Sequence, residues 1–217
     1  MWQHRRVKPR AAAWAVLAAV VFVGACAHTG GYEPASLAAA RRPATTTAEG
    51  KALVYTTAAD DAYVFTGRPT SFTGSATTLT LPLGVIVKES ARAAFADHFK
   101  GGAEATGEPR LPAGYMVLVR PRLVDFSYEY NQLKNIGFAV TPTVRTTVQV
   151  QVLDATGTVR WERTYPSGDV EDAAYFIETA PGARIGRIAH EALYKVMARA
   201  AEDIVREGVG SEAVPKP

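Results

Sequence analysis

Hydrophobic and polar positions follow two different periods along the chain, and these periods predict strands in some segments and helices in others. The strongest alternation covers residues 144–152, where Val and Thr at even positions alternate with Arg, Thr and Gln at odd positions. Asp154–Gly157 has the composition of a turn, and Val159, Trp161 and Tyr165 resume the alternation beyond it. This pattern predicts a β-hairpin.

Three further strands are predicted, over residues 52–57, 77–81 and 115–130. The longest of them contains Pro121. Because proline cannot donate a ladder hydrogen bond, we expect a bulge or an edge position there. Beyond the proline, one face of this strand is expected to carry Val124, Phe126, Tyr128 and Tyr130.

The helical period occurs twice, over residues 84–99 and 184–207. Gly101 and Gly102 end the first helix. The apolar residues of each helix form a stripe along one face. The stripe of the second helix is expected to pack on a sheet, and the alternative is that it forms the seam of a coiled coil. The first stripe contains Val87, Ala91, Ala94, Phe95 and Phe99, and the second contains Ile185, Ile188, Ala189, Ala192, Leu193, Val196, Met197, Ala200 and Ile204.

This order of elements predicts an α+β fold, a mainly antiparallel sheet of four to five strands with two helices packed on one face. The elements lie within residues 51–207, which are long enough to bury one core as a single domain. The exposed side of the sheet or the helix stripe offers a surface for self-association, so a homo-oligomer is one hypothesis.

The first 25 residues differ from the rest of the chain. Residues 1–10 carry four basic side chains and no acid, and residues 11–25 carry no charge. This pattern is typical of a secretory signal peptide, because a membrane-spanning helix needs about 20 apolar residues. Cys26, the only cysteine, follows directly.

The string Val23-Gly24-Ala25-Cys26 resembles the bacterial lipobox. The resemblance implies signal cleavage between Ala25 and Cys26, a diacylglycerol on the Cys26 sulfur, and a fatty acyl chain such as palmitate on the new amino terminus. Ala27 stands where an aspartate would favour the inner membrane, which implies the outer membrane, with the domain facing the periplasm. A free cysteine at the end of an uncleaved hydrophobic anchor is the alternative.

Removal of the signal peptide changes the charge balance. The whole chain has a formal charge of +3, but the residues after position 25 have 20 basic against 21 acidic side chains, a balance of −1. We therefore expect no surface for nucleic acid.

The segments that flank the domain have few large apolar residues. Residues 26–50 are rich in Ala, Thr, Gly and Pro, which predicts a lipidated amino terminus followed by a flexible tether. Its r.m.s. span would be about 25–30 Å. Residues 208–217 predict a disordered tail.

The sequence contains no recognised catalytic, metal-binding or cofactor motif, so we expect a protein that is not an enzyme. His190 begins a HExxH zinc motif, but Tyr194 stands where the second histidine is required. His190 is therefore predicted to be exposed to solvent beside the helix stripe. The acidic pairs Asp60-Asp61 and Glu171-Asp172 are predicted to be solvated in loops.

Two connections carry apolar residues that suit a contact surface, 131–139 and 166–183. Partner or membrane contact is one interpretation, and folding back as a cap over the core is the other. The candidate contact residues are Leu133, Ile136, Phe138, Tyr175 and Phe176.

The lipobox together with a helix before long strands and a late helix resembles small periplasmic accessory lipoproteins of the YajG-like, LptE-like and ABC-transport-auxiliary types. The resemblance implies a non-catalytic module that binds envelope proteins in assembly or transport. The rival is a ligand-binding or enzymatic lipoprotein with a pocket between the sheet and segment 166–183. That rival requires polar groups such as Asp125, Glu129 or His98 to converge in a deep pocket.

Replacement of the lipobox cysteine tests this interpretation. Cys26→Ser is expected to abolish lipid attachment and to leave unprocessed precursor, which mass spectrometry of the membrane fraction would detect. Normal lipidation of the variant would refute the lipobox assignment.

Overall fold

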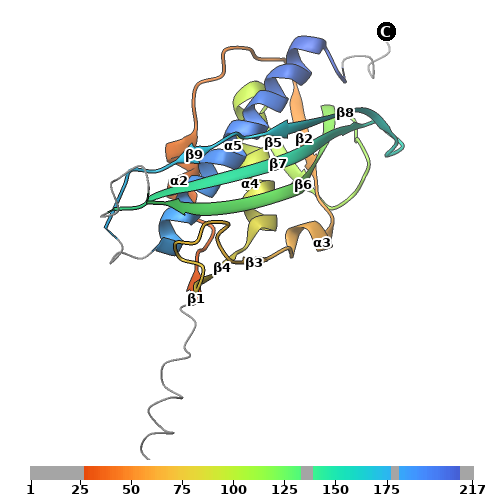
Figure 1. Ribbon diagram of the computed structural model, residues 1–217. Helices are drawn as coiled ribbons and strands as arrows, with labels where there is room; N and C mark the ends of the chain where they lie inside the picture. Colours follow the sequence, from red (N-terminus) through yellow and green to blue (C-terminus); the bar gives the residue numbers. More distant parts are fainter. Residues whose placement is uncertain (1–26, 133–138, 177–180, 211–217) are drawn as a thin grey trace, which may run out of the picture.

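The computed structural model describes residues 27–132, 139–176 and 181–210, which form two sheets and four helices (Figure 1). In spatial order, the larger sheet contains β5 (Ala103–Thr106), β2 (Lys51–Tyr55), β6 (Tyr115–Asn131), β7 (Thr141–Leu153) and β8 (Val159–Pro166), with β9 (Val170–Glu171) paired to β7. The smaller sheet contains β1 (Ala27–Thr29), β4 (Thr78–Leu81) and β3 (Phe65–Gly67). The helices are α2 (Pro34–Ala40), α3 (Ala58–Asp61), α4 (Leu83–His98) and α5 (Pro181–Glu207).

The α+β class is confirmed, but the main sheet is mixed and has six strands. The strands β6, β7 and β8 are antiparallel, whereas β2 is parallel to both of its neighbours, β5 and β6. A parallel neighbour requires a crossover connection, and the chain from β2 to β5 includes α4. The short strand β5 was not predicted, because its sequence AEAT covers only four residues and has no apolar residue larger than alanine.

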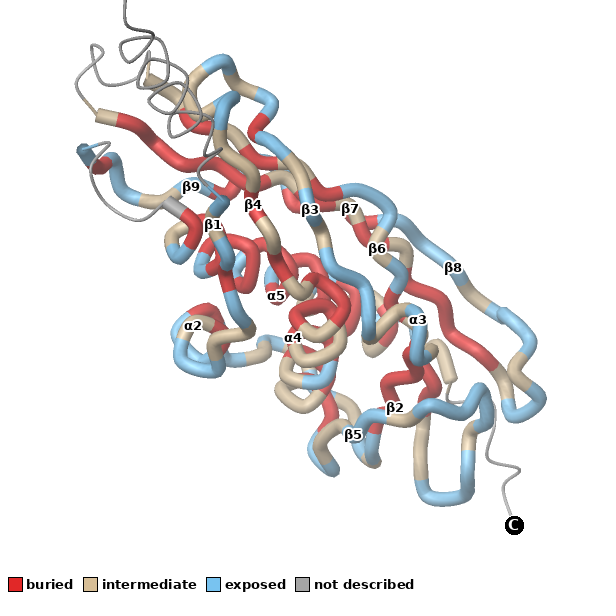
Figure 2. Tube along the Cα trace, turned by 90° about the horizontal axis from the view of Figure 1, so that it is seen from below, coloured by how far each residue is buried: buried red, intermediate tan, exposed pale blue. Residues whose placement is uncertain are grey.

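Both long helices lie side by side on one face of the six-stranded sheet, as predicted, and α2 covers the outer side of α5 (Figures 1 and 2). All residues of the two predicted stripes are buried. Gly102 follows α4 with φ +81°, a left-handed conformation that suits glycine at a helix end.

A β-bulge divides β6 into two parts, and the side chains that are buried in the main hydrophobic core have odd residue numbers in the first part and even numbers in the second. Its register against β7 shifts between Leu123 and Asp125, so residue 124 has no partner of its own. Odd positions such as Val119 and Pro121 are buried before the bulge, and even positions such as Phe126 are buried after it. Val124 is 60% exposed, so the expectation that it shares a face with Phe126 is wrong.

The predictions for Pro121 and for the hairpin are confirmed. Pro121 lies just beyond Val119, the last residue of β6 that pairs with β2. The strands β7 and β8 form the predicted antiparallel hairpin, with Val148 opposite Tyr165. Gly157 closes the turn with φ +83°, and the Asp154 carboxylate accepts hydrogen bonds from the turn.

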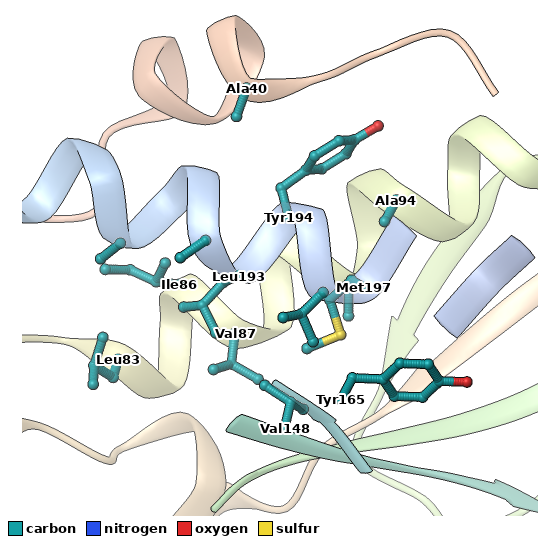
Figure 3. Packing of buried hydrophobic residues seen from close by; sticks show 14 of the residues in the cluster. Ala40, Leu83, Ile86, Val87, Ala94, Val148, Tyr165, Leu193, Tyr194 and Met197 are labelled. Atoms are coloured by element: carbon teal, nitrogen blue, oxygen red, sulfur yellow. The ribbon is translucent and has the colours of Figure 1, made fainter. Parts of the chain in front are cut away.

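The amino-terminal segment is packed on the domain, so the prediction of a flexible tether is wrong for this part of the chain. Ala27 pairs with Thr78 in the parallel ladder between β1 and β4. Leu37 and Ala40 of α2 are buried, and Ala40 faces α5 in Figure 3. Small residues carry little hydrophobic signal in the sequence, but they allow a close approach of the two helices.

Two polar side chains of α5 hold this segment in place. His190 accepts a hydrogen bond at Nε2 from the backbone N–H of Glu33 (3.1 Å), and its Nδ1 lies 2.7 Å from the carbonyl oxygen of Gly186. The Tyr194 hydroxyl contacts the backbone of Arg42 and donates to Asp97 (2.8 Å). His190 is fully buried, so the prediction that it faces solvent is wrong. Burial lowers its pKa below the ordinary value of 6.5.

Because the folded state disfavours protonated His190, the free energy of unfolding is expected to decrease as the pH falls below about 6.5, where the unfolded chain takes up the proton. Urea denaturation of the mature chain at several pH values would measure this slope. His190→Gln keeps a polar side chain without a titrating ring, and it should flatten the slope. Equal slopes in the two proteins would contradict the assignment.

Candidate functional site

Ala27, the first residue of β1, lies at one end of the small sheet, which we call the β1 end. Because β1 runs parallel to β4 and Ala27 pairs with Thr78, the chain enters β1 at the point where the 68–77 loop enters β4. Ala25 and Cys26 lie outside the described residues, so cleavage and lipidation stay predictions. The β1 end comprises residues 27–32, the 68–77 loop and residues 128–132 at the end of β6.

The 68–77 loop is held on the edge of β6 by hydrogen bonds. The backbone N–H of Thr70 donates to the carbonyl of Tyr128 (2.9 Å), and the N–H of Tyr130 donates to the Ser71 hydroxyl (2.9 Å). Between these contacts and Gly74 (φ +77°), Phe72 is 94% exposed. The Thr- and Gly-rich sequence of this loop gave no prediction of such a contact.

The five candidate contact residues have different outcomes in the structure. Leu133, Ile136 and Phe138 lie outside the described residues. Tyr175 is buried, its backbone pairs with Val140, and the Arg184 guanidinium lies over its ring at 4.5 Å. The prediction of Tyr175 as an exposed contact is therefore wrong, and the alternative of a cap over the core is correct for it. Phe176 is 70% exposed.

A cavity of about 340 Å³ opens between α3, the start of α4 and the bulge of β6. Three exposed hydrophobic residues, Tyr63 (46%), Val64 (50%) and Val124 (60%), lie in or beside it. Its polar lining includes Asp60, Arg122 and Asp125, and its apolar lining includes Phe65, Leu83, Val87 and Phe126.

Local structure explains the position of this cavity. The hydroxyl and backbone N–H of Thr57 donate to Asp60 in a capping box that begins α3. Gly84 packs against the backbone of α3, where a Cβ atom would overlap the carbonyl oxygen of Asp60. Burial raises the pKa of Asp60, but hydrogen bonds from Thr57 and the charge of Arg120 outweigh burial and hold it below its ordinary value.

The acidic pairs are engaged in the fold rather than solvated in loops. Asp60 and Asp61 belong to α3, and Asp61 forms an ion pair with Lys88 (2.6 Å). The Asp172 side chain is 10% exposed and lies between Arg184 (3.3 Å) and Arg187. Within the described ranges, no group of three or more His, Cys, Asp and Glu residues could hold a metal ion.

The polar groups required by the rival hypothesis do not meet. Asp125 lines the α3–β6 cavity, whereas Glu129 pairs with Arg145 (3.0 Å), which also binds Asp169 (2.5 Å). His98 is buried, and its Nδ1 lies 2.8 Å from the carbonyl oxygen of Ala94. Val170 and Tyr175, in the described part of segment 166–183, are packed in the core.

A second cavity, of about 550 Å³, lies at the carboxyl-terminal end of α5. Its lining includes Met116, Leu153, Trp161 and Val209. The backbone N–H of Val209 donates to the carbonyl of Ile204 (3.0 Å), and a Cβ atom at Gly210 would meet the carbonyl of Met116. Residues 208–210 therefore pack on the domain, unlike the predicted tail. In the described part of the chain, no helix has the length and apolar character to span a bilayer.

The chain matches no family model and no curated protein. Similar solved structures include a protein described as a neuraminyllactose-binding hemagglutinin homolog from Helicobacter pylori, 9% identical over 79% of this chain and 95% of that one (TM-score 0.38). A minor lipoprotein from Acinetobacter baumannii is 12% identical over 79% and 98% of the two chains (TM-score 0.33). Lipoprotein B from Nitrosomonas europaea is 14% identical over 79% and 95% (TM-score 0.31). At such TM-scores, these likenesses establish neither a shared fold nor a shared function.

Proposed function

We propose that this chain is a lipid-anchored protein of the bacterial cell envelope, attached through Cys26 after cleavage behind Ala25. The domain faces the periplasm from the outer membrane and acts as a non-catalytic interaction module in envelope assembly or transport. The observation that carries this proposal is the lipobox Val23–Cys26 behind a basic segment and an apolar run.

The chemistry of the anchor supports a stable membrane attachment. One acyl chain binds a membrane only marginally, whereas two or more anchor it stably, and a lipobox cysteine receives a diacylglycerol. Cys26 is bonded directly to Ala27, the first residue of β1. The acylated residue would therefore be continuous with the folded domain.

The character of the α3–β6 cavity supports a protein partner. Tyr63, Val64 and Val124 present exposed apolar surface, and Asp60, Arg122 and Asp125 place charge around it. An apolar centre with a charged rim is typical of protein interfaces. The histidines His98 and His190 support a non-catalytic role, because both rings are buried and bonded to the backbone.

A small ligand in the same cavity is the second candidate. Its volume of about 340 Å³ lies near the lower end of the range for small-molecule sites, about 300–1,000 Å³. Crosslinking distinguishes a small ligand from a protein partner. A partner bound at the cavity would form a covalent protein–protein product with a photoreactive residue there, whereas a small ligand would not.

Site-specific photocrosslinking in intact cells tests the partner. A photoreactive amino acid at Val124 is expected to yield a discrete product with an envelope protein, because this side chain is 60% exposed beside the cavity. Val159, 43% exposed at the start of β8, is the matched control and should not yield that product. The same product from both positions, or none from Val124, would count against an interaction module at this cavity.

A further inference from the structure

Four segments at and around the β1 end contain no charged residue. Residues 27–32, 69–81, 139–144 and 173–176 contain no Asp, Glu, Lys or Arg, although 21% of the whole chain is charged. Charged residues that border these segments form ion pairs: Glu129 and Asp169 pair with Arg145, and Asp172 pairs with Arg184 and Arg187. Arg68 is the first residue of the loop. Transfer of an unpaired charge out of water costs much more free energy than transfer of hydroxyl and apolar groups, so this composition suits a non-aqueous neighbour.

Phe72 projects from this end in a fixed loop. Three contacts fasten the loop to β6, from Thr70, Ser71 and Thr73, the last through a hydrogen bond to Gln132 (2.8 Å). The side chain of Phe72 between them is nevertheless 94% exposed. Hydrophobic burial favours the removal of so large a side chain from water, and within the described fold no such burial is provided.

A second aromatic residue lies nearby. Phe176 is 70% exposed, and it follows Tyr175, whose backbone pairs with Val140 next to the start of β7. The start of β7 pairs with the end of β6, on which the 68–77 loop lies. Phe72 and Phe176 therefore belong to the same end of the domain.

The opposite end of the domain also carries several ion pairs. Gly182, at the start of α5, lies against His28 of β1, whereas Glu207, at the end of α5, accepts hydrogen bonds from Trp161 and Arg163. At 1.5 Å per residue, these two ends of the helix are about 37 Å apart. Asp154 pairs with Arg160, and Asp203 pairs with Arg163, at or near this far end.

The direction of β1 brings the chain into the fold beside the uncharged part of the loop, residues 69–77. Cys26 immediately precedes Ala27, and Ala27 pairs with Thr78, the residue that follows the Phe72 loop. Consecutive Cα atoms are about 3.8 Å apart, so the acylated residue cannot lie far from this loop while β1 is paired.

We propose that the β1 end, led by Phe72, lies against the surface of the bilayer that holds the Cys26 acyl chains. This inference rests on the proposed lipid anchor and adds the orientation of the domain. Phe72 enters the interfacial region, the uncharged loop follows it, and Arg68 lies at the depth of the lipid phosphates.

Fluorescence quenching by brominated lipid tests the orientation. The mature chain has one tryptophan, Trp161, because Trp2 and Trp14 belong to the signal peptide. The acylated full chain would be reconstituted into vesicles of phosphatidylglycerol and phosphatidylcholine brominated on its acyl chains. Three proteins are compared: the unaltered chain, and Phe72→Trp and Val124→Trp, each in a Trp161→Phe background.

The Trp emission of the Phe72→Trp variant is expected to fall at least about twofold in brominated relative to unbrominated vesicles, because an indole in the interfacial region reaches the boundary between headgroups and acyl chains and so approaches the bromine atoms. Val124 is also exposed but lies six residues along β6 from Tyr130, about 20 Å away. Emission from Val124→Trp and from Trp161 should stay nearly unchanged.

Equal quenching at all three positions, or no quenching of Phe72→Trp in an acylated chain that floats with the vesicles, would overturn the orientation. In the second case the β1 end would serve another contact, such as a protein partner. A chain that is not acylated by mass spectrometry and does not float would overturn the lipid anchor itself, and the orientation with it.

Discussion

The structure depends on the burial of α5 on more than one side. Leu193 and Met197 project from α5 toward α4 and toward the sheet, where Val148 lies (Figure 3). Tyr194 lies toward α2 and Ala40 in the same view. A helix covered in this way must satisfy its buried polar groups, and His190 does so by binding the backbone of Glu33. The amino-terminal segment therefore belongs to the core, although its composition resembles that of a linker.

This packing replaces the predicted free tether by a segment that is part of the fold. A free tether of residues 26–50 would let the domain move at about 25–30 Å from the bilayer. The ladder between β1 and β4 instead begins one residue after Cys26. Under the proposed anchoring, a fixed attachment would give the domain a preferred orientation, with the β1 end toward the bilayer and the carboxyl-terminal end of α5 away from it.

The predictable parts of the fold are those in which large apolar residues repeat with a regular period. The stripes of α4 and α5 and the β7–β8 hairpin were predicted because such residues are buried whichever surface covers them. The bulge at Val124 was not predicted, because one additional residue reverses the parity of a strand without a change in composition. β1, α2 and β5 were missed for another reason. Their small or polar side chains become buried or paired only because other elements meet them.

The same limit applies to the candidate site. The lipobox is local in sequence and could be identified directly, whereas the α3–β6 cavity combines α3, α4 and β6 from distant parts of the chain. Phe72 stands in a Thr-rich segment, and only its hydrogen-bonded loop on β6 shows that it is held away from the core. His190 and Tyr175 were placed at the surface because their partners, Glu33 and Val140, are remote in sequence.

Amide hydrogen exchange over residues 27–40 of the acylated chain tests the central claim, that the lipid-bearing segment is part of the fold, most directly. The N–H of Gly30 donates to the carbonyl of Thr80 (2.9 Å), and the N–H of Glu33 donates to His190. Both amides are predicted to be protected to a degree similar to those of β4, and His190→Ala should release the amide of Glu33. Exchange of this segment at the rate of an unstructured chain would contradict the account.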